Sequence, residues 1–356
     1  MSALNLGIIG AGGISQKHLQ GYGELKDDVK IAAIAETDEN KLNRAAEKYC
    51  IADKYTNYKE LLARKDIDFV CVCLPNYLHA PVTIEALNAG KHVHCEKPMA
   101  MNASEAQAMV DAKNKTGKKL MIGLNNRFTP NAMFVKKYIE EGRLGEIYFA
   151  KTGWVRRDGL PHAGWFCEKE KSGGGALIDL GVHFIVLVLY YLCYPGFKSI
   201  TAKTYSKLGR PETYRIYANS AAGDDAGVRY DVEELAAGFV ELKNQVDLMF
   251  EISWASNIEN ERNFYEIYGT DGGIKYSWEN GKIPELKIFS RIDGQMVDIQ
   301  PRIKPELYKE NEFRHFINCI RANKEPVVSV PEQGVEMMRL IDNIYRSAET
   351  GKQIVF

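Results

Sequence analysis

The sequence predicts two successive folds: an α/β domain with a parallel sheet, then an α+β domain with a large, mostly antiparallel open sheet. First, its 356 residues exceed the roughly 250 to 300 that one hydrophobic core usually organises. Second, apolar segments alternate with helical patterns from residue 4 to about 141, which is typical of strands joined by crossover helices. Third, longer strand patterns follow Gly145. We therefore place the first domain at residues 1–124 and the second at 125–356.

The first domain shows strand patterns with helical patterns between them, at residues 4–10, 30–36, 68–74, 92–96 and 120–124. One helix, at 79–90, is sharply bounded, because Pro81 suits a first helical turn and Gly90 suits a left-handed stop. The buried face of this helix would then carry three apolar residues, Val82, Ala86 and Leu87.

The second domain is predicted from strand patterns at 146–155, 199–207, 235–242, 246–254 and 263–269. The segment Gly269-Thr-Asp-Gly-Gly273 is a hairpin signal after the last of them. Helical patterns would cover one face of the sheet, at 175–192, 306–323 and 333–348. The polar, glycine-containing segment 209–231 is predicted to be a surface excursion.

Charge and hydropathy exclude several classes of partner. Lys and Arg number 46 against 47 Asp and Glu, so no net basic field favours nucleic acid or an anionic membrane. The apolar run Phe184–Tyr194 is shorter than the roughly 20 residues of a membrane span and predicts a buried helix. The first residues enter a strand pattern directly, without an export segment, which predicts a cytoplasmic protein.

The cysteines predict neither disulfides nor a metal site. An odd number without repeated spacing gives no disulfide framework and no zinc pattern: Cys50, Cys71, Cys73, Cys95, Cys167, Cys193 and Cys319. Cys71 and Cys73 alternate along a predicted strand, so both side chains would point to one face. Small buried thiols are therefore favoured there over metal or redox chemistry.

A glycine-rich turn follows the first strand, in Gly10-Ala-Gly12-Gly13-Ile14-Ser15, and a helical pattern begins at once. The first glycine permits the tight turn, and the second lets a pyrophosphate approach the backbone. The helix N-terminus adds oriented N–H groups and positive potential. This context predicts a Rossmann domain that binds a dinucleotide through Gly10, Gly12, Gly13 and Ile14.

The acidic residue that such a domain needs is Glu36, at the end of the second strand. A carboxylate there accepts both ribose hydroxyls and repels a 2′-phosphate. No Arg or Lys occurs from 36 to 40 to receive such a phosphate, which favours NAD over NADP. Thr37 leaves NADP possible.

Further ordered motifs span nearly the whole chain: Leu74-Pro-Asn76-Tyr-Leu-His79, Glu96-Lys97-Pro98, Gly123-Leu-Asn125-Asn-Arg127-Phe128, Ser172-Gly-Gly-Gly-Ala-Leu-Ile-Asp179-Leu-Gly-Val-His183 and Ile344-Tyr-Arg-Ser-Ala. Together with the glycine-rich turn, they resemble the Gfo/Idh/MocA oxidoreductases, the family of glucose-fructose oxidoreductase and inositol 2-dehydrogenase. The resemblance implies an NAD(P)-dependent dehydrogenase that acts on a secondary hydroxyl of a sugar, glycoside or polyol such as an inositol. The first domain would bind the cofactor, and the second would bind substrate and form oligomers.

The resemblance makes Lys97 a catalytic residue, and an ammonium beside the reacting oxygen would stabilise alkoxide character during oxidation. Asp179 and His183 lie four apart on a helical pattern, so they would share a face. His183 is then the general base for the hydroxyl proton, while Asp179 orients it or binds a neighbouring hydroxyl. The nicotinamide half of the cofactor would contact Leu74, Asn76, His79, Glu96, Lys97 and Asn125.

Substrate would bind between the domains, and we expect it to contact Lys97, Arg127, Trp165, Asp179 and His183. Two assignments stay open. Arg127 either binds substrate or braces the domain junction, and the tryptophans 154, 165 and 254 could equally be core or interface residues. Family members often carry an acidic residue three positions after the histidine, where this chain has Val186. We expect a difference in packing or in the residues behind the site there, which leaves the details of the substrate contacts open but not the assignment of His183.

Two other functions use the same features. In a redox-neutral enzyme, tightly bound NAD would oxidise a sugar transiently before elimination or epimerisation. In a regulator, the fold would bind NAD without turnover, although the retained Lys97, Asp179 and His183 argue against this. We expect a homo-oligomer, a dimer or a tetramer, because the exposed face of the second domain's sheet is the usual association surface in similar proteins.

Overall fold

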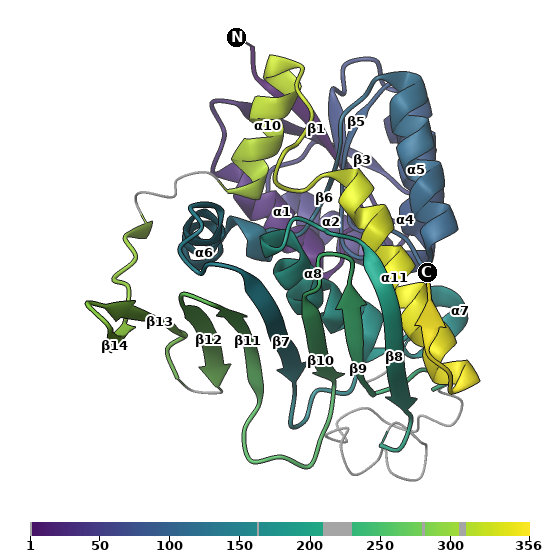
Figure 1. Cartoon of the computed structure of the whole chain (residues 1–356). Helices are drawn as coiled ribbons and strands as arrows, with labels where there is room; N and C mark the ends of the chain where they lie inside the picture. Colours follow the sequence, from purple (N-terminus) through teal and green to yellow (C-terminus); the bar gives the residue numbers. More distant parts are fainter. Residues whose placement is uncertain (1, 162–163, 209–229, 280–281, 306–310) are drawn as a thin grey trace. The chain divides into compact units, whose positions relative to one another are not determined.

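The computed structural model describes residues 2–161, 164–208, 230–279, 282–305 and 311–356 (Figure 1). Two compact units make up the chain: Met1–Phe128 with Glu310–Val335, and Thr129–Lys309 with Glu336–Phe356. The described residues 311–335 therefore pack with the first unit, although they come after the strands of the second unit in the sequence. The predicted surface excursion at 209–231 lies almost entirely outside the described residues.

The first unit is built on a six-stranded parallel sheet in the order β3-β2-β1-β4-β5-β6. This order reverses direction between β1 and β4, and such a switch point is where Rossmann folds bind dinucleotides. The strands are β1 (Leu4–Ile9), β2 (Val29–Ala35), β3 (Asp53–Tyr55), β4 (Phe69–Val72), β5 (His92–Cys95) and β6 (Leu120–Ile122). All the predicted strands are present, and only the short β3 was not predicted.

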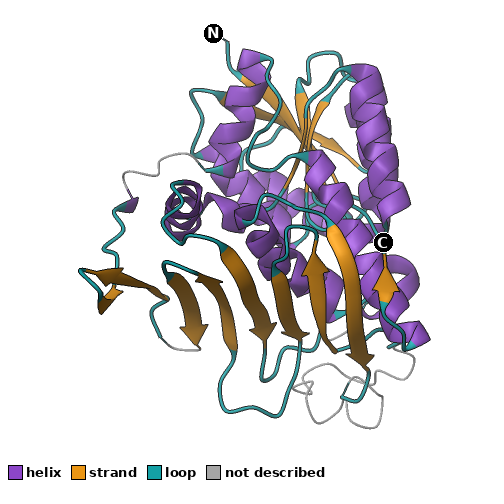
Figure 2. Ribbon diagram, viewed as in Figure 1, coloured by secondary structure: helices purple, strands orange, loops and turns teal. Residues whose placement is uncertain are grey.

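Helices cover both faces of this sheet (Figure 2). They are α1 (Gly13–Gly23), α2 (Glu39–Lys48), α3 (Tyr58–Ala63), α4 (Asn76–Asn88) and α5 (Ala103–Thr116). Helix α4 begins at Asn76 rather than at His79, so Pro81 lies inside it and not in its first turn. Pro75 precedes Asn76 and sets the start instead. The predicted stop is confirmed, because Gly90 has a φ of 80°.

Helix α10 (Glu312–Ala322) also belongs to the first unit. The prediction that the helix at 306–323 covers the second sheet is therefore wrong. Its apolar face packs on α1, where a side chain on Gly21 would overlap the ring of Phe313. Arg321 pairs with Asp28 at the end of the α1–β2 connection. Periodicity showed that α10 has a buried face, but it does not show which element covers that face.

Glu312, at the start of α10, is almost completely buried, and its Oε2 has no hydrogen-bond partner among the described residues. Burial raises the pKa of this carboxyl group from 4.5 to about 7, and Glu96 contributes in the same direction against His18 and Lys17. Ionisation then opposes folding: the penalty is absent below pH 4.5, grows up to about pH 7 and is complete above it. We expect Glu312→Gln to stabilise the protein at pH 8 by about 1 to 3 kcal/mol.

The measurement is thermal unfolding at pH 5 and at pH 8, and the gain should shrink strongly at pH 5. The control is Glu39→Gln, which changes an exposed carboxylate in the first turn of α2. An equal stabilisation by Glu312→Gln at both pH values would contradict a buried acid that titrates near neutrality.

The second unit is built on a nine-stranded sheet in the order β14-β13-β12-β11-β7-β10-β9-β8-β15. Its only parallel pair among the described residues is β7 with β10, so the predicted mostly antiparallel sheet is confirmed. The predicted hairpin joins β11 to β12. The strands are β7 (Ile147–Val155), β8 (Phe197–Tyr205), β9 (Leu235–Leu242), β10 (Asp247–Ser253), β11 (Arg262–Gly269), β12 (Gly273–Glu279), β13 (Glu285–Ile292), β14 (Gln295–Ile299) and β15 (Ile354–Val355).

Helices α6 (Pro130–Glu140), α7 (Lys169–Ser172) and α8 (Val182–Tyr191) belong to this unit, and α11 (Pro331–Thr350) lies mostly in it. Helix α8 packs against β7 and β11. It ends the stretch Lys169–Tyr191, which is long and apolar enough to cross a membrane, yet 83% of its most apolar window is buried. The apolar run is thus a core helix, as predicted.

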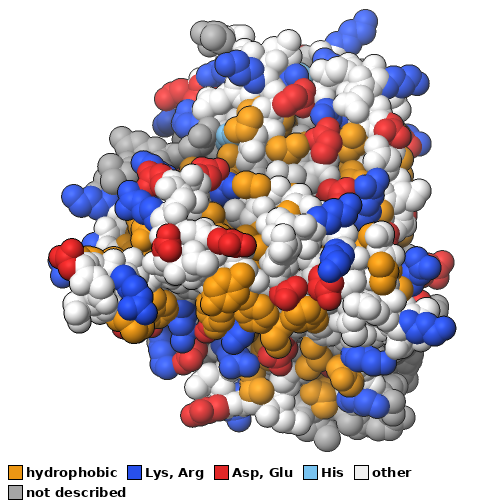
Figure 3. Space-filling view, in the orientation of Figure 1, with side chains coloured by type: hydrophobic (Ala, Val, Ile, Leu, Met, Phe, Trp, Pro, Cys, Tyr) orange, Lys and Arg blue, Asp and Glu red, His pale blue; other side chains and the backbone are white. Residues whose placement is uncertain are grey.

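Part of the sheet surface in the second unit is apolar and exposed. Figure 3 shows hydrophobic side chains gathered over its strands. The exposed apolar residues on the face of the sheet that carries Lys151 include Tyr205, Met249, Met296 and Val355. An apolar surface of this kind is typical of an association site.

Candidate active site

The glycine-rich turn connects β1 to α1 with the geometry that the sequence predicts. Gly10 has a φ of 99°, and a Cβ on it would overlap the carbonyl oxygen of Cys73. Its N–H donates to the carbonyl oxygen of Ala35 at 2.8 Å, which ties the turn to the end of β2. Both the backbone conformation and the available space therefore require glycine at this position.

Gly12 and Gly13 face open space. A Cβ on either one meets no atom within 4 Å among the described residues. Gly12 is the N-cap of α1, and no described side chain caps the first N–H groups of this helix. Uncapped N–H groups at a helix N-terminus are an anion site. The turn thus fits the pyrophosphate of a dinucleotide in both space and hydrogen bonding.

Glu36 stands directly beside this turn. Its Oε2 accepts the N–H of Ala11 at 2.8 Å, and its Oε1 accepts the N–H of Asp38 at 3.0 Å. The carboxylate therefore fixes the turn in addition to the ribose contact that the sequence predicts. Oε1 also accepts the hydroxyl of Thr37 at 3.2 Å, so Oε2 is the oxygen that keeps a lone pair for a ribose hydroxyl.

His79 is buried between two loops. Its Nδ1 lies 2.6 Å from the carbonyl oxygen of Pro98, and its Nε2 lies 2.7 Å from that of Leu74. Burial lowers the pKa of His79, whereas the two carbonyl acceptors favour the charged ring. The ring joins the loop after β4 to the turn after β5. Asn76, the first residue of α4, is buried beside it.

Glu96 is the buried neighbour of Lys97. Its Oε1 lies 2.7 Å from Nε2 of His18, and its Oε2 accepts the backbone N–H of Lys97 at 3.1 Å. Burial favours the neutral acid, but the bond and charge of His18 outweigh it and lower the pKa of Glu96 to about 2. Gly123 leaves room for the carboxylate, since a Cβ there would lie 3.1 Å from Oε1. His18 was not singled out in the sequence.

Arg127 and Asn125 lie in a short 3-10 helix, Asn125–Phe128. Asn125 is exposed. Arg127 is only 1% exposed, and its Nη1 donates to the carbonyl oxygen of Val328 at 2.8 Å and to Oε1 of Gln333 at 2.6 Å. Of the two roles left open for Arg127, these contacts favour bracing, here within the first unit.

Close packing within the second unit requires glycine at two positions of the run 173–175. A Cβ on Gly174 would overlap the hydroxyl of Tyr345, and one on Gly175 would overlap the carbonyl oxygen of Glu233. The Glu233 carboxylate accepts the N–H groups of Gly175 at 3.0 Å and Leu177 at 2.9 Å, and the hydroxyl of Tyr345 at 2.9 Å. Glu233 thus caps the helical stretch that carries Asp179 and His183. No pattern in the sequence indicates this role.

Asp179 lies in a π-helical turn, Leu177–Gly181, that leads into α8. Such turns are frequent at functional sites. Its Oδ2 accepts the indole N–H of Trp254 at 2.9 Å, and Trp254 is fully buried. Trp254 is therefore a core residue that also orients the Asp179 carboxylate. The ring of His183 packs at a tilt against Trp154, with 5.6 Å between centroids.

Two more aromatic groups lie in the second unit. Trp154 donates from Nε1 to Glu261 Oε1 at 3.1 Å, and the guanidinium of Arg156 lies 4.9 Å from its ring centroid. Trp165 stacks on Phe166 with 3.9 Å between centroids. Val186, at the position where family members often carry an acidic residue, is buried and packs in the core. This agrees with the expected packing difference.

Two family profiles match the chain. The profile of the Gfo/Idh/MocA oxidoreductases with an NAD-binding Rossmann fold matches residues 4–124, and the profile of their C-terminal alpha/beta domain matches 136–356. The chain belongs to the Gfo/Idh/MocA family of NAD-binding oxidoreductases. The resemblance drawn from the motifs, the predicted fold class and the predicted cofactor are confirmed.

The chain is similar to two curated dehydrogenases and to a solved structure of one of these enzymes. D-glucoside 3-dehydrogenase of Escherichia coli K12 is 31% identical over 99% of this chain and 97% of its own length. Levoglucosan dehydrogenase of Pseudarthrobacter phenanthrenivorans is 29% identical over 78% of this chain and 75% of its own length. A solved levoglucosan dehydrogenase in complex with NADH and L-sorbose covers 100% of this chain and 99% of its own, with a TM-score of 0.87 at 24% identity. That structural likeness supports the fold.

Proposed function

We propose that the chain is an NAD-dependent dehydrogenase that oxidises a secondary hydroxyl of a sugar, glycoside or polyol to a ketone. The observation that carries this proposal is the similarity to D-glucoside 3-dehydrogenase along 99% of the chain. D-glucosides are accordingly the first substrates to test. NADP is the less favoured cofactor, because Glu36 stands where a 2′-phosphate would lie.

The cofactor residues in this proposal come from the first unit. The glycine-rich turn from Gly10 to Ile14 receives the pyrophosphate, and Glu36 accepts the ribose hydroxyls. The nicotinamide half would contact the loops after β4, β5 and β6, through Leu74, Asn76, Glu96, Lys97 and Asn125. His79 is buried between two of these loops and would hold them in place.

Catalysis is proposed for Lys97, Asp179 and His183. Bound NAD supplies the acceptor for the hydride that leaves the substrate carbon. His183 takes the hydroxyl proton, while Asp179, held by Trp254, orients the base or binds a neighbouring hydroxyl. Lys97 stabilises negative charge on the oxygen. Trp165 is proposed to contact the sugar ring, and Arg127 to brace the first unit.

Domain roles and assembly are also proposals. Residues 1–124 would bind the cofactor, and residues 125–356 would bind substrate and form the oligomer. The exposed apolar residues on the second sheet would form the contact of a homodimer or homotetramer. The enzyme is proposed to work in the cytoplasm, without nucleic acid or a membrane as partner.

The decisive experiment follows the reduction of NAD and, in parallel, of NADP by the purified protein, through the absorbance of the reduced nicotinamide. The panel contains D-glucosides, aldoses, inositols and sugar alcohols. We expect NAD reduction with a D-glucoside to exceed NADP reduction by at least about 10-fold. Silence across the panel, with cofactor still bound after purification, would contradict a dehydrogenase and favour the redox-neutral reaction.

A further inference from the structure

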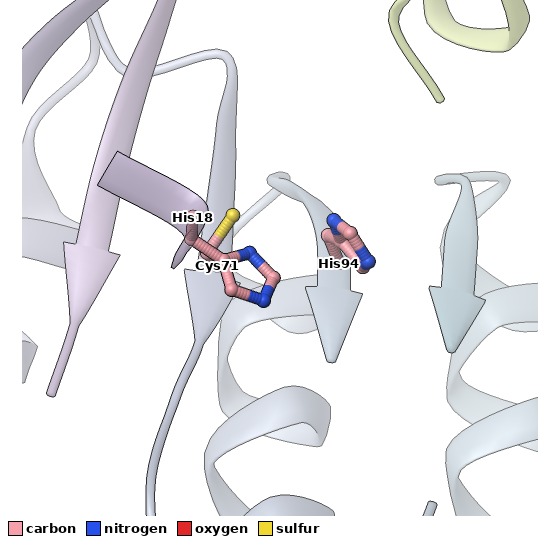
Figure 4. Close-up of side chains that lie close together, drawn as sticks. All are labelled: His18, Cys71 and His94. Atoms are coloured by element: carbon pink, nitrogen blue, oxygen red, sulfur yellow. The ribbon is translucent and has the colours of Figure 1, made fainter. Parts of the chain in front are cut away.

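A group of buried polar side chains lies behind the turn that carries Lys97. We call it the His18 cluster: His18, Tyr22, Cys71, His94, Glu96 and Glu312, all buried in the first unit. Figure 4 shows three of them, with His18 on α1 beside Cys71 of β4 and His94 of β5. Polar groups are expensive to bury unless their contacts serve the structure or the function.

One continuous chain of contacts runs through this cluster to Lys97. His18 Nε2 lies 2.7 Å from Glu96 Oε1, and the backbone N–H of Lys97 donates to Glu96 Oε2 at 3.1 Å. Both carboxylate oxygens of Glu96 are thus engaged, one from α1 and one from the turn after β5. Because α1 begins at the glycine-rich turn, the same helix meets the proposed pyrophosphate site at its start and Glu96 one turn later.

A metal ion is the competing explanation of the cluster. His18, Cys71 and His94 each offer one ligand atom, and these atoms lie within 4.8 Å of one another. His18 Nε2 and His94 Nδ1 are engaged by Glu96 and by the hydroxyl of Tyr22, whereas His18 Nδ1 and His94 Nε2 have no hydrogen-bond partner among the described residues. Burial raises the pKa of Cys71, which favours the thiol over the thiolate that binds metals. We therefore argue from the contact between His18 and Glu96 and make metal binding an outcome of the test.

We propose that His18 is a positioning residue for Lys97, acting through the carboxylate of Glu96. A charged imidazole on one side of the carboxylate fixes its orientation, so that the other oxygen holds the Lys97 backbone in one place. This inference rests on the proposed function, because it concerns the residue that would act on the substrate oxygen. It assigns His18 no contact with substrate or cofactor.

The charges around the pair set its pH dependence. Burial opposes the imidazolium, but the contacts with Cys71 and Glu96 outweigh it and hold the pKa of His18 well above its ordinary value. With Cys71 as a thiol, Glu96 is the charged partner of His18. Glu312 from α10 and Cys73, which follows β4, also face the cluster, with Lys17 nearby. Without the His18 charge, Glu96 would be a buried carboxylate near Glu312, and its pKa would rise. Protonated Glu96 is a poorer acceptor for the Lys97 N–H.

The test compares His18→Leu and His18→Gln with the control Tyr22→Phe. Leucine removes both bond and charge, whereas glutamine keeps an N–H donor without the charge. Tyr22→Phe perturbs the same cluster but leaves Glu96 untouched. For both His18 variants we expect kcat at pH 6 to be about 10- to 100-fold lower. We also expect the acid limb of the pH profile of kcat to move up by about one pH unit or more. The Kd for NAD should stay within about threefold.

An activity-independent readout is hydrogen exchange at the peptide that contains Lys97, which should become faster in His18→Leu and remain unchanged in Tyr22→Phe. An unmoved acid limb together with unchanged exchange would overturn the proposal. So would metal in the purified protein at one equivalent that His18→Leu and Cys71→Ser both lose. If Lys97→Met keeps full turnover, the catalytic role proposed for Lys97 fails instead, while the exchange result still tests the contact between Glu96 and Lys97.

Discussion

Lys97→Met is expected to lower kcat for the oxidation by about 10²- to 10⁴-fold, the usual effect of removing one positioned acid–base or electrostatic group. Methionine keeps much of the length of lysine but offers no donor to the substrate oxygen. The Kd for NAD should change by less than about threefold, because the glycine-rich turn and Glu36 are untouched. Initial rates and fluorescence titration of NAD measure the two quantities separately.

The matched variant is His183→Ala in the second unit, for which we expect a similar loss in kcat and the same unchanged Kd for NAD. Full turnover in either variant would remove that residue from the mechanism. If Lys97→Met instead weakens NAD binding by about 100-fold with kcat preserved, Lys97 is a cofactor ligand and not a catalytic residue.

Local patterns were sufficient for most elements of the fold. The strands of the first sheet and the hairpin between β11 and β12 follow from alternation and turn residues that are close in sequence. The placement of α10 could not be predicted in this way, because an amphipathic helix shows the same pattern whichever surface covers it. Arg321 of α10 pairs with Asp28, which lies 293 residues earlier in the chain. The three-residue β3 is too short for alternation to be visible.

The candidate site divides in the same way. Gly10 and Lys97 were predicted as site residues because they lie in short contiguous motifs. The side-chain contacts behind the candidate residues were not predicted, because each joins residues far apart in the sequence: His18 and Glu96 are separated by 78 residues, and Trp254 and Asp179 by 75. Glu233 caps Gly175 in the same manner, from 58 residues away. One sequence contains no signal for such pairings.

The glycine-rich turn offers a test in which fold and function separate. Gly10→Ala is expected to destabilise the protein by about 2 to 4 kcal/mol, because its φ is 99° and its Cβ would overlap the Cys73 carbonyl. Gly12→Ala should change stability by less than about 0.5 kcal/mol, since Gly12 has a φ of −72° and its Cβ meets no described atom within 4 Å. Thermal unfolding without cofactor measures both.

Gly12→Ala, which should hardly change stability, should have a large effect on the Kd for NAD when NAD is titrated. A methyl group on Gly12 lies where the pyrophosphate would approach the backbone, so we expect the Kd for NAD to rise by about 10- to 100-fold although the fold is intact. Gly23→Ala, at the far end of α1 and also in open space among the described residues, is the control that should change neither quantity appreciably. Normal NAD affinity in Gly12→Ala would contradict cofactor binding over this turn, because the added methyl group would lie where the pyrophosphate is proposed to approach the backbone.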